Sequence, residues 1–150
     1  MASTELKSRI KEAMKTAMRA KDKPRLSTIR LIMAEIKRIE VDERIEVDDT
    51  RLIAVLDKML KQRRDSEKQY TDAGRAELAQ VEADEIVVIQ DFLPEALSAE
   101  ELDTLVQEAV SESGASSMQD MGKVMAILKP KVQGRADMGA ISGKVKKALI

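Results

Sequence analysis

Seven basic side chains in the last 33 residues are the part of this sequence best suited to binding chemistry. They are Lys123, Lys129, Lys131, Arg135, Lys144, Lys146 and Lys147. Only Asp120 and Asp137 oppose them between residues 118 and 150, which leaves this range with a net charge of +5. Lysine and arginine bind phosphate oxygens through charge-assisted hydrogen bonds, so the segment predicts an anionic partner such as an RNA backbone.

The segment that precedes these residues has the opposite charge. Residues 94–117 contain six acids and no base, whereas residues 1–93 contain nineteen residues of each sign. Two other interpretations of the basic segment therefore stand beside RNA binding. The cations can form a solvated face, favoured near helix C-termini, or they can dock on these acids or on the acidic face of a partner protein.

The absence of histidine and cysteine excludes several kinds of catalytic and metal site. Serine–histidine and cysteine–histidine catalysis, disulfides and zinc sites built on imidazole or thiolate are all ruled out. No glycine-rich phosphate loop or dinucleotide fingerprint appears. The adjacent acids Asp48–Asp49, Asp84–Glu85 and Glu100–Glu101 are interpreted as helix-start residues rather than magnesium ligands. We predict no catalytic residue, metal or cofactor, and we do not expect the chain to be an enzyme by itself.

Aromatic residues are nearly absent, since Tyr70 and Phe92 are the only two. Proteins that bind single-stranded nucleic acid usually stack several bases on aromatic rings. Any RNA contact is therefore expected to reach the backbone of a folded, helical RNA rather than its bases.

Three arginines occur in or beside apolar helical patterns of the N-terminal half: Arg30, Arg63 and Arg64. A guanidinium at a partly buried position usually has a carboxylate partner, so we interpret these arginines as structural residues of a helical bundle. An interaction surface is the alternative. The carboxylates that could pair with them are Asp65, Glu67 and Glu85.

Gly122 and Lys123 fall in the expected first turn of a helix. Glycine inside a helix costs up to about 1 kcal/mol relative to alanine, so a close approach to the backbone is expected there. The approaching group is either a phosphate at the helix N-terminus or another helix. The same packing interpretation applies to Gly139 and Gly143.

Composition and hydrophobic spacing predict an all-α protein, because helix formers dominate and glycine and proline are scarce. Four helical patterns predict an N-terminal bundle or hairpin of long helices over residues 1–93. Three shorter patterns predict a small three-helix module over residues 94–150. The boundary is placed at Phe92-Leu93-Pro94, where the charge changes just before a capping box formed by Ser98 and Glu101.

Capping and breaking residues mark the expected helix ends. Expected starts are at Ser3 or Thr4, Pro24, Asp48 or Asp49, Ser98, Ser116 or Ser117, and Asp137, and expected ends are at Gly74, Gly114 and Pro130. No apolar run has the length of a signal peptide or a membrane span. We therefore expect a cytoplasmic protein.

Four stretches of the sequence resemble the YqeY-like proteins, which are grouped with the C-terminal tail of the GatB subunit of tRNA-dependent amidotransferase. They are RLSTIRLI at 25–32, KQRRDS at 61–66, FLP at 92–94, and MGKVM with LKP at 121–130 continuing into GRAD at 134–137. These stretches span nearly the whole chain. The similarity to GatB itself is narrower and covers about residues 95–150.

The resemblance implies a helical N-terminal bundle joined to a three-helix tail module. In the amidotransferase, that tail contacts the elbow of tRNA, and the catalytic parts lie elsewhere. The first function expected here is therefore a non-catalytic accessory protein that binds tRNA or another structured RNA through its basic C-terminal module. The alternative is a helical adaptor between proteins. A component of glutamine-dependent carbon–nitrogen ligase chemistry comes third.

Overall fold

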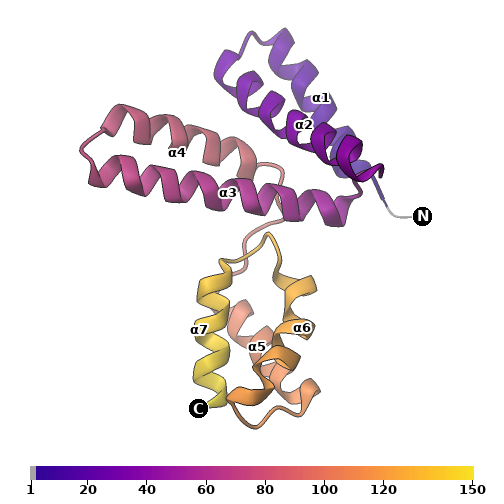
Figure 1. Ribbon diagram of the computed structural model, residues 1–150, viewed down its shortest axis with the longest axis vertical. Helices are drawn as coiled ribbons and strands as arrows, with labels where there is room; N and C mark the ends of the chain where they lie inside the picture. Colours follow the sequence, from indigo (N-terminus) through magenta and orange to yellow (C-terminus); the bar gives the residue numbers. More distant parts are fainter. Residues whose placement is uncertain (1–2) are drawn as a thin grey trace. The chain divides into compact units, whose positions relative to one another are not determined.

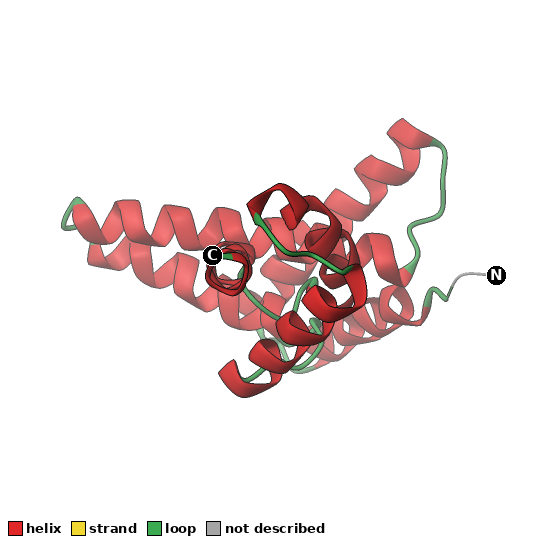
Figure 2. Cartoon of the chain, turned by 90° about the horizontal axis from the view of Figure 1, so that it is seen from below, coloured by secondary structure: helices red, strands yellow, loops and turns green. Residues whose placement is uncertain are grey.

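The computed structural model describes residues 3–150, and all regular structure in this range is helical (Figure 1, Figure 2). The prediction of an all-α protein is therefore confirmed. The helices are α1 (Glu5–Arg19), α2 (Lys23–Glu43), α3 (Asp49–Asp72), α4 (Ala76–Gln90), α5 (Ala99–Ser113), the 3-10 turn η1 (Met118–Asp120), α6 (Met121–Val132) and α7 (Met138–Leu149). No helix in the described part of the chain is long and apolar enough to cross a bilayer.

The chain divides into two compact units, one up to Leu93 and the other from Pro94 onward. In the first unit α3 packs along α4 and α1 packs along α2, as Figure 1 shows. Each fully buried isoleucine or leucine stabilises this unit by about 1.5–3 kcal/mol. The fully buried isoleucine and leucine side chains are Ile10, Ile29, Ile32, Leu52, Leu56 and Ile89.

The start of α1 is fixed by a residue of α3 rather than by a local cap. Thr4 occupies the N-cap position but makes no side-chain capping bond. Asp49 Oδ1 instead accepts a hydrogen bond from the Leu6 backbone N–H at 2.9 Å, and the Asp49 N–H donates to the Ser3 carbonyl at 2.8 Å. These two bonds tie the first turns of α1 and α3 together. Asp48 caps α3, as the sequence predicts.

Glu40 joins three parts of the first unit. Its carboxylate accepts hydrogen bonds from Lys7 Nζ of α1 at 2.6 Å and from the Val47 backbone N–H at 2.9 Å. Val47 lies in the connection to α3, and its side chain is fully buried. The Lys7 hydrogen bond is the main reason that the pKa of Glu40 lies below its usual value. Glu40 therefore anchors both α1 and the α2–α3 connection to α2.

The end of the first unit is held by two arginines around one aromatic ring. Phe92 is buried, and the guanidinium carbons of Arg9 and Arg25 lie 5.6 and 5.7 Å from its ring centroid. Arg25 pairs with the Asp91 carboxylate at 2.7 Å, while Arg9 donates to the Asp91 carbonyl at 2.7 Å. These cation–π contacts and hydrogen bonds fix the chain where it leaves α4. Two of the family-like stretches, 25–32 and 92–94, thus meet in space.

The second unit buries apolar side chains from α5, α6 and α7 around its own core. The predicted capping box is present, because Ser98 Oγ accepts from the Glu101 N–H and the Glu101 side chain accepts from the Ser98 N–H. Asp137 caps α7 as expected. One prediction is wrong: Pro130 does not end α6, which continues to Val132. A proline in the last turn removes only one backbone hydrogen bond, so the helix tolerates it.

We expect Glu40→Gln to destabilise the protein by roughly 1 kcal/mol at neutral pH, because an amide replaces a carboxylate that accepts two hydrogen bonds. The lowered pKa of Glu40 means that its ionised form stabilises the folded state above the pKa of the unfolded chain. This contribution disappears as the pH falls through the folded-state pKa. Thermal unfolding of both proteins across this pH range measures the difference.

The matched control is Glu46→Gln, which removes an exposed carboxylate 3.6 Å from the same Lys7 Nζ. Exposed ion pairs contribute little, so this variant should unfold like the wild type at every pH. An equal loss of stability in both variants would contradict the role assigned to Glu40.

Candidate functional site

Three of the predicted phosphate-binding lysines are exposed and have no ion-pair partner among the described residues: Lys129, Lys146 and Lys147. All three lie near the C-terminal ends of α6 or α7. The negative end of a helix dipole favours cations at these positions. Their charges are therefore free to meet an external anion.

Two further lysines are held only loosely. Lys123 Nζ lies 3.8 Å from Asp120 and its side chain is 71% exposed. Lys131 Nζ lies 3.9 Å from Glu112. Exposed pairs at these distances are worth little, so either lysine can turn to another anion at small cost.

The structure assigns the remaining two cations to the fold of the second unit. Arg135 Nε donates to the Glu95 carbonyl at 3.0 Å, and the Arg135 carbonyl accepts from the Leu97 N–H at 2.9 Å. Arg135 thus ties the segment before α5 to the turn between α6 and α7. Lys144 Nζ pairs with Asp103 of α5 at 2.5 Å. Lys144 therefore has a carboxylate partner, whereas Arg135 uses one of its five N–H donors on a backbone carbonyl and has no carboxylate partner among the described residues.

The free lysines do not form a single patch. Lys129 belongs to the last turn of α6, whereas Lys146 and Lys147 belong to the last turn of α7. The short connection over residues 133–137 joins the end of α6 to the beginning of α7 (Figure 1). The two groups are therefore separated by about the length of α7, which is ~18 Å at 1.5 Å per residue.

The region around Gly122 contradicts one of the two interpretations offered by the sequence. A Cβ added at Gly122 or Gly143 would meet nothing within 4 Å, so no helix packs closely on either residue and that interpretation is wrong. At Gly139 the nearest atom to such a Cβ is a carboxylate oxygen of Asp137, the cap of α7. The N-terminus of α6 is preceded by η1, whose Met118 carbonyl accepts the Met121 N–H. A phosphate arriving there would also meet the Asp120 carboxylate.

The three arginines of the first unit have different environments. Arg63 Nε donates to Glu85 of α4 at 3.1 Å, and both side chains are largely buried. Glu85 is one of the three carboxylates that the sequence analysis named as possible partners for these arginines. Arg30 and Arg64 are exposed and form no ion pair within the described chain. A structural role through a carboxylate therefore applies to Arg63 and not to the other two.

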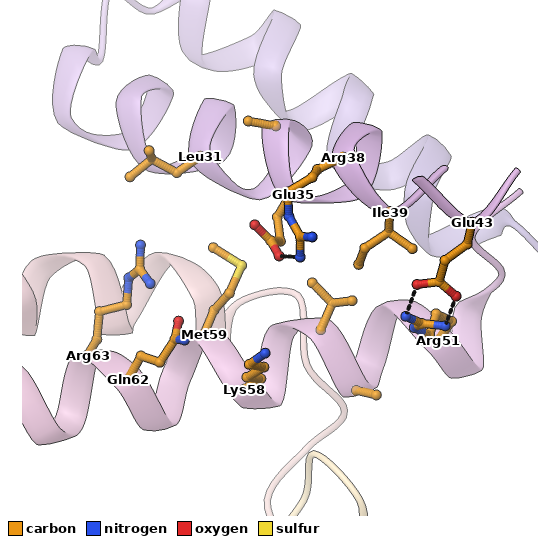
Figure 3. Close-up of a pocket in the computed structure, with 13 residues that line it drawn as sticks. Leu31, Glu35, Arg38, Ile39, Glu43, Arg51, Lys58, Met59, Gln62 and Arg63 are labelled. Carbon is orange, nitrogen blue, oxygen red and sulfur yellow. Dashed lines mark hydrogen bonds and ion pairs between the residues drawn. The ribbon is translucent and has the colours of Figure 1, made fainter. Parts of the chain in front are cut away.

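A groove of about 510 Å³ lies between α2 and α3 (Figure 3). Ile39, Val55 and Met59 supply apolar surface on its walls. Its charged residues are mostly paired, as Figure 3 shows for Arg38 with Glu35 and for Arg51 with Glu43. The Arg51–Glu43 pair is bidentate, with N–O distances of 2.9 and 2.5 Å, and this hydrogen bonding lowers the pKa of Glu43.

Sequence reasoning missed these pairs for different reasons. Glu35 and Arg38 are three residues apart on α2, so the helical spacing rule could have found them. Glu43 and Arg51 belong to different helices, and only the reversal of the chain between α2 and α3 brings them together. No local pattern indicates that contact.

A model of the family described as Yqey-like protein matches residues 7–149. The chain belongs to this family. The matched residues run from α1 to α7 and therefore include both units of this chain.

Relatives found by sequence comparison carry the name Altered inheritance of mitochondria protein 41, mitochondrial. The protein of Pyrenophora tritici-repentis is 31% identical over 147 residues, covering 94% of this chain and 79% of the relative. That of Kluyveromyces lactis is 31% identical over 141 residues, covering 91% and 72%. That of Vanderwaltozyma polyspora is 34% identical over 120 residues, covering 75% of this chain and 64% of the relative.

These names correct one expectation. They describe mitochondrial proteins, which overturns the cytoplasmic location expected from the sequence. That expectation used the absence of a long apolar run, which does not select a compartment. Composition alone therefore gave the wrong location.

We expect Glu82→Gln to stabilise the protein slightly, by roughly 0.5 kcal/mol at neutral pH. Burial on α4, followed by the charge of neighbouring Glu85, raises the pKa of Glu82. A raised carboxyl pKa means that ionisation destabilises the folded state, so the neutral amide is favoured above this pKa. The advantage should vanish as the pH falls and Glu82 becomes protonated, and thermal unfolding at neutral and acidic pH measures it.

Glu77→Gln provides the control, because Glu77 is exposed in the first turn of the same helix, where the dipole favours a negative charge. It should not stabilise the protein. A gain from Glu77→Gln equal to that from Glu82→Gln would show that the effect is not local to Glu82.

Proposed function

We propose that this protein is a non-catalytic, RNA-associated accessory protein that contacts the backbone of tRNA or another folded RNA through α6 and α7. The observation that carries the proposal is the set of unpaired, exposed lysines, Lys129, Lys146 and Lys147. They stay unpaired although residues 94–117 of the same unit supply six acids. Asp103 and Glu112, which do pair, are used by Lys144 and Lys131.

The arrangement of these lysines favours a folded RNA. A folded RNA displays phosphates on the separate strands that border its grooves, and proteins recognise it by this shape. Two lysine groups about 18 Å apart, at the two ends of α7, suit contacts with separate backbone segments. The second unit contains no aromatic residue on which bases could stack.

The division of the chain fits this function. We propose that α1–α4 form the supporting bundle and that α5–α7 form a three-helix binding module. The similarity of the second unit to the amidotransferase tail supports the same division. Arg135 contributes by fixing the module's geometry, because its Nε–H and its carbonyl hold the segment before α5, and its remaining guanidinium N–H groups can still donate to a phosphate.

A protein adaptor is the second candidate function. The groove between α2 and α3 supports it, since Leu31 lines this groove and its side chain is 43% exposed. The paired charges around the groove would not attract RNA. This candidate becomes the first one if RNA binding fails the following test.

We expect the triple variant Lys129→Gln, Lys146→Gln and Lys147→Gln to bind total tRNA on the order of tenfold more weakly than the wild type. Each lost phosphate contact should lower the log–log salt slope by about 0.7–0.9, which gives a total loss of about 2.1–2.7 for three contacts. Filter binding to tRNA, unstructured RNA and duplex DNA at several salt concentrations measures both quantities. The wild type should prefer tRNA.

A matched control removes three exposed, unpaired cations from α3 of the other unit, through Lys61→Gln, Arg64→Gln and Lys68→Gln. It should retain nearly all affinity for tRNA. Equal losses in the two triple variants would contradict the proposal and reduce RNA binding to a general effect of net charge.

A further inference from the structure

A second groove, between α1 and α2, differs from the groove between α2 and α3 in its charge. It has a volume of about 490 Å³, and four cations line it: Lys7, Lys11, Arg30 and Lys37. Glu40 is the one acid among its lining residues. The groove is therefore positively charged although the whole chain has a net charge of −1.

The single carboxylate of this groove is already engaged. Glu40 accepts hydrogen bonds from Lys7 Nζ at 2.6 Å and from the Val47 N–H at 2.9 Å. Lys11, Arg30 and Lys37 are exposed and have no ion-pair partner within the described residues. Three cations of the described chain thus line the groove without an ion-pair partner, although, after the Lys7 hydrogen bond, the charge of Lys11 also contributes to lowering the pKa of Glu40.

The groove between α2 and α3 shows why unpaired cations matter for the binding of an anion. Around the α2–α3 groove, Arg38, Arg51 and Arg63 each have a carboxylate partner, and only Lys58 has none within the described part of the chain. An anion that binds any of the three arginines would therefore have to displace an existing pair. Around the α1–α2 groove, Lys11, Arg30 and Lys37 have none to displace. An entering anion would gain their attraction and lose no internal ion pair.

The spacing of the cations indicates an extended ligand. Arg30 and Lys37 are seven residues apart, which places them on one face of α2 about 10.5 Å from each other. Lys11 belongs to α1, on the other side of the groove. A chain of phosphates would let Arg30 and Lys37 each contact a phosphate of its own without bending toward each other.

We propose that the groove between α1 and α2 is a second binding site for the phosphodiester backbone of RNA. The proposal rests on the proposed function, because RNA supplies a chain of phosphates that matches three uncompensated cations spread along one groove. Lys11 and Lys37 act as point charges toward the phosphates, and Arg30 can bind phosphate oxygens bidentately. Lys7 is excluded from this role because Glu40 holds it.

The test uses full-length protein in four forms: the wild type, the groove variant Lys11→Gln/Arg30→Gln/Lys37→Gln, the α6–α7 triple variant, and the α3 control. The groove variant and the control each remove two lysines and one arginine, and each set includes a pair of cations seven residues apart. The groove variant should bind tRNA several-fold more weakly, with a salt slope lowered by about 2.1–2.7. The control should match the wild type.

The failures of the two proposals are distinguishable. If the α6–α7 variant loses affinity and the groove variant behaves like the control, the inference about the groove is overturned and the proposed function stands. If only the groove variant loses affinity, the groove is the RNA site and the role of α6 and α7 is overturned. If poly-glutamate competes for the groove as well as tRNA does, the site binds acidic protein and the RNA inference is overturned.

A measurement on the wild-type protein avoids any dependence on variant folding. Bound tRNA should reduce acylation of the Lys11 and Lys37 amines at least several-fold, as measured by mass spectrometry of the labelled peptides. Lys61 and Lys68 of α3 should keep their unbound labelling. Equal labelling of Lys11 and Lys37 with and without tRNA would overturn the inference.

Discussion

Ion pairing inside each unit determines which cations of this protein remain able to bind a ligand. Arg63 is joined to Glu85 and Lys144 to Asp103, and in both cases the pair connects two helices. Separating the Arg63–Glu85 pair would leave a largely buried carboxylate without its partner, which is costly. Lysines such as Lys146 and Lys147 have no carboxylate partner in the described chain from which they would have to be separated. The acids therefore stabilise the fold by pairing with some of the cations. The cations that they leave unpaired are the ones to which a polyanion can bind.

The sequence allowed those parts of the fold to be predicted that depend on neighbouring residues. Asp48, Ser98 and Asp137 cap their helices because a short polar side chain reaches the backbone N–H groups of its own first turn. Long-range capping was not predictable in this way. The start of α1 is held by Asp49, 43 residues from its hydrogen-bond partner Leu6, and only the folded chain brings them together.

The same limit applies to the candidate site. A count of charges located the basic segment correctly but treated its seven cations as equivalent. Arg135 differs from Lys129 because the loop geometry of the second unit places its side chain against the Glu95 carbonyl. The α1–α2 groove was missed because its cations lie on two helices that are separated in sequence by other charges of both signs. The excess of positive charge in this groove becomes apparent only when the structure shows which acids are already paired.

Two anion sites in separate units affect binding in a way that neither does alone. Once one site holds an RNA, the other meets the same molecule at an effective concentration set by the connection between them, and this raises affinity without any new contact. Each site can then be weak, which suits exposed lysines that gain only modest energy from each phosphate. If both proposed sites bind RNA, a preference for an RNA long enough to reach both follows from this linkage, even though neither site contacts a base.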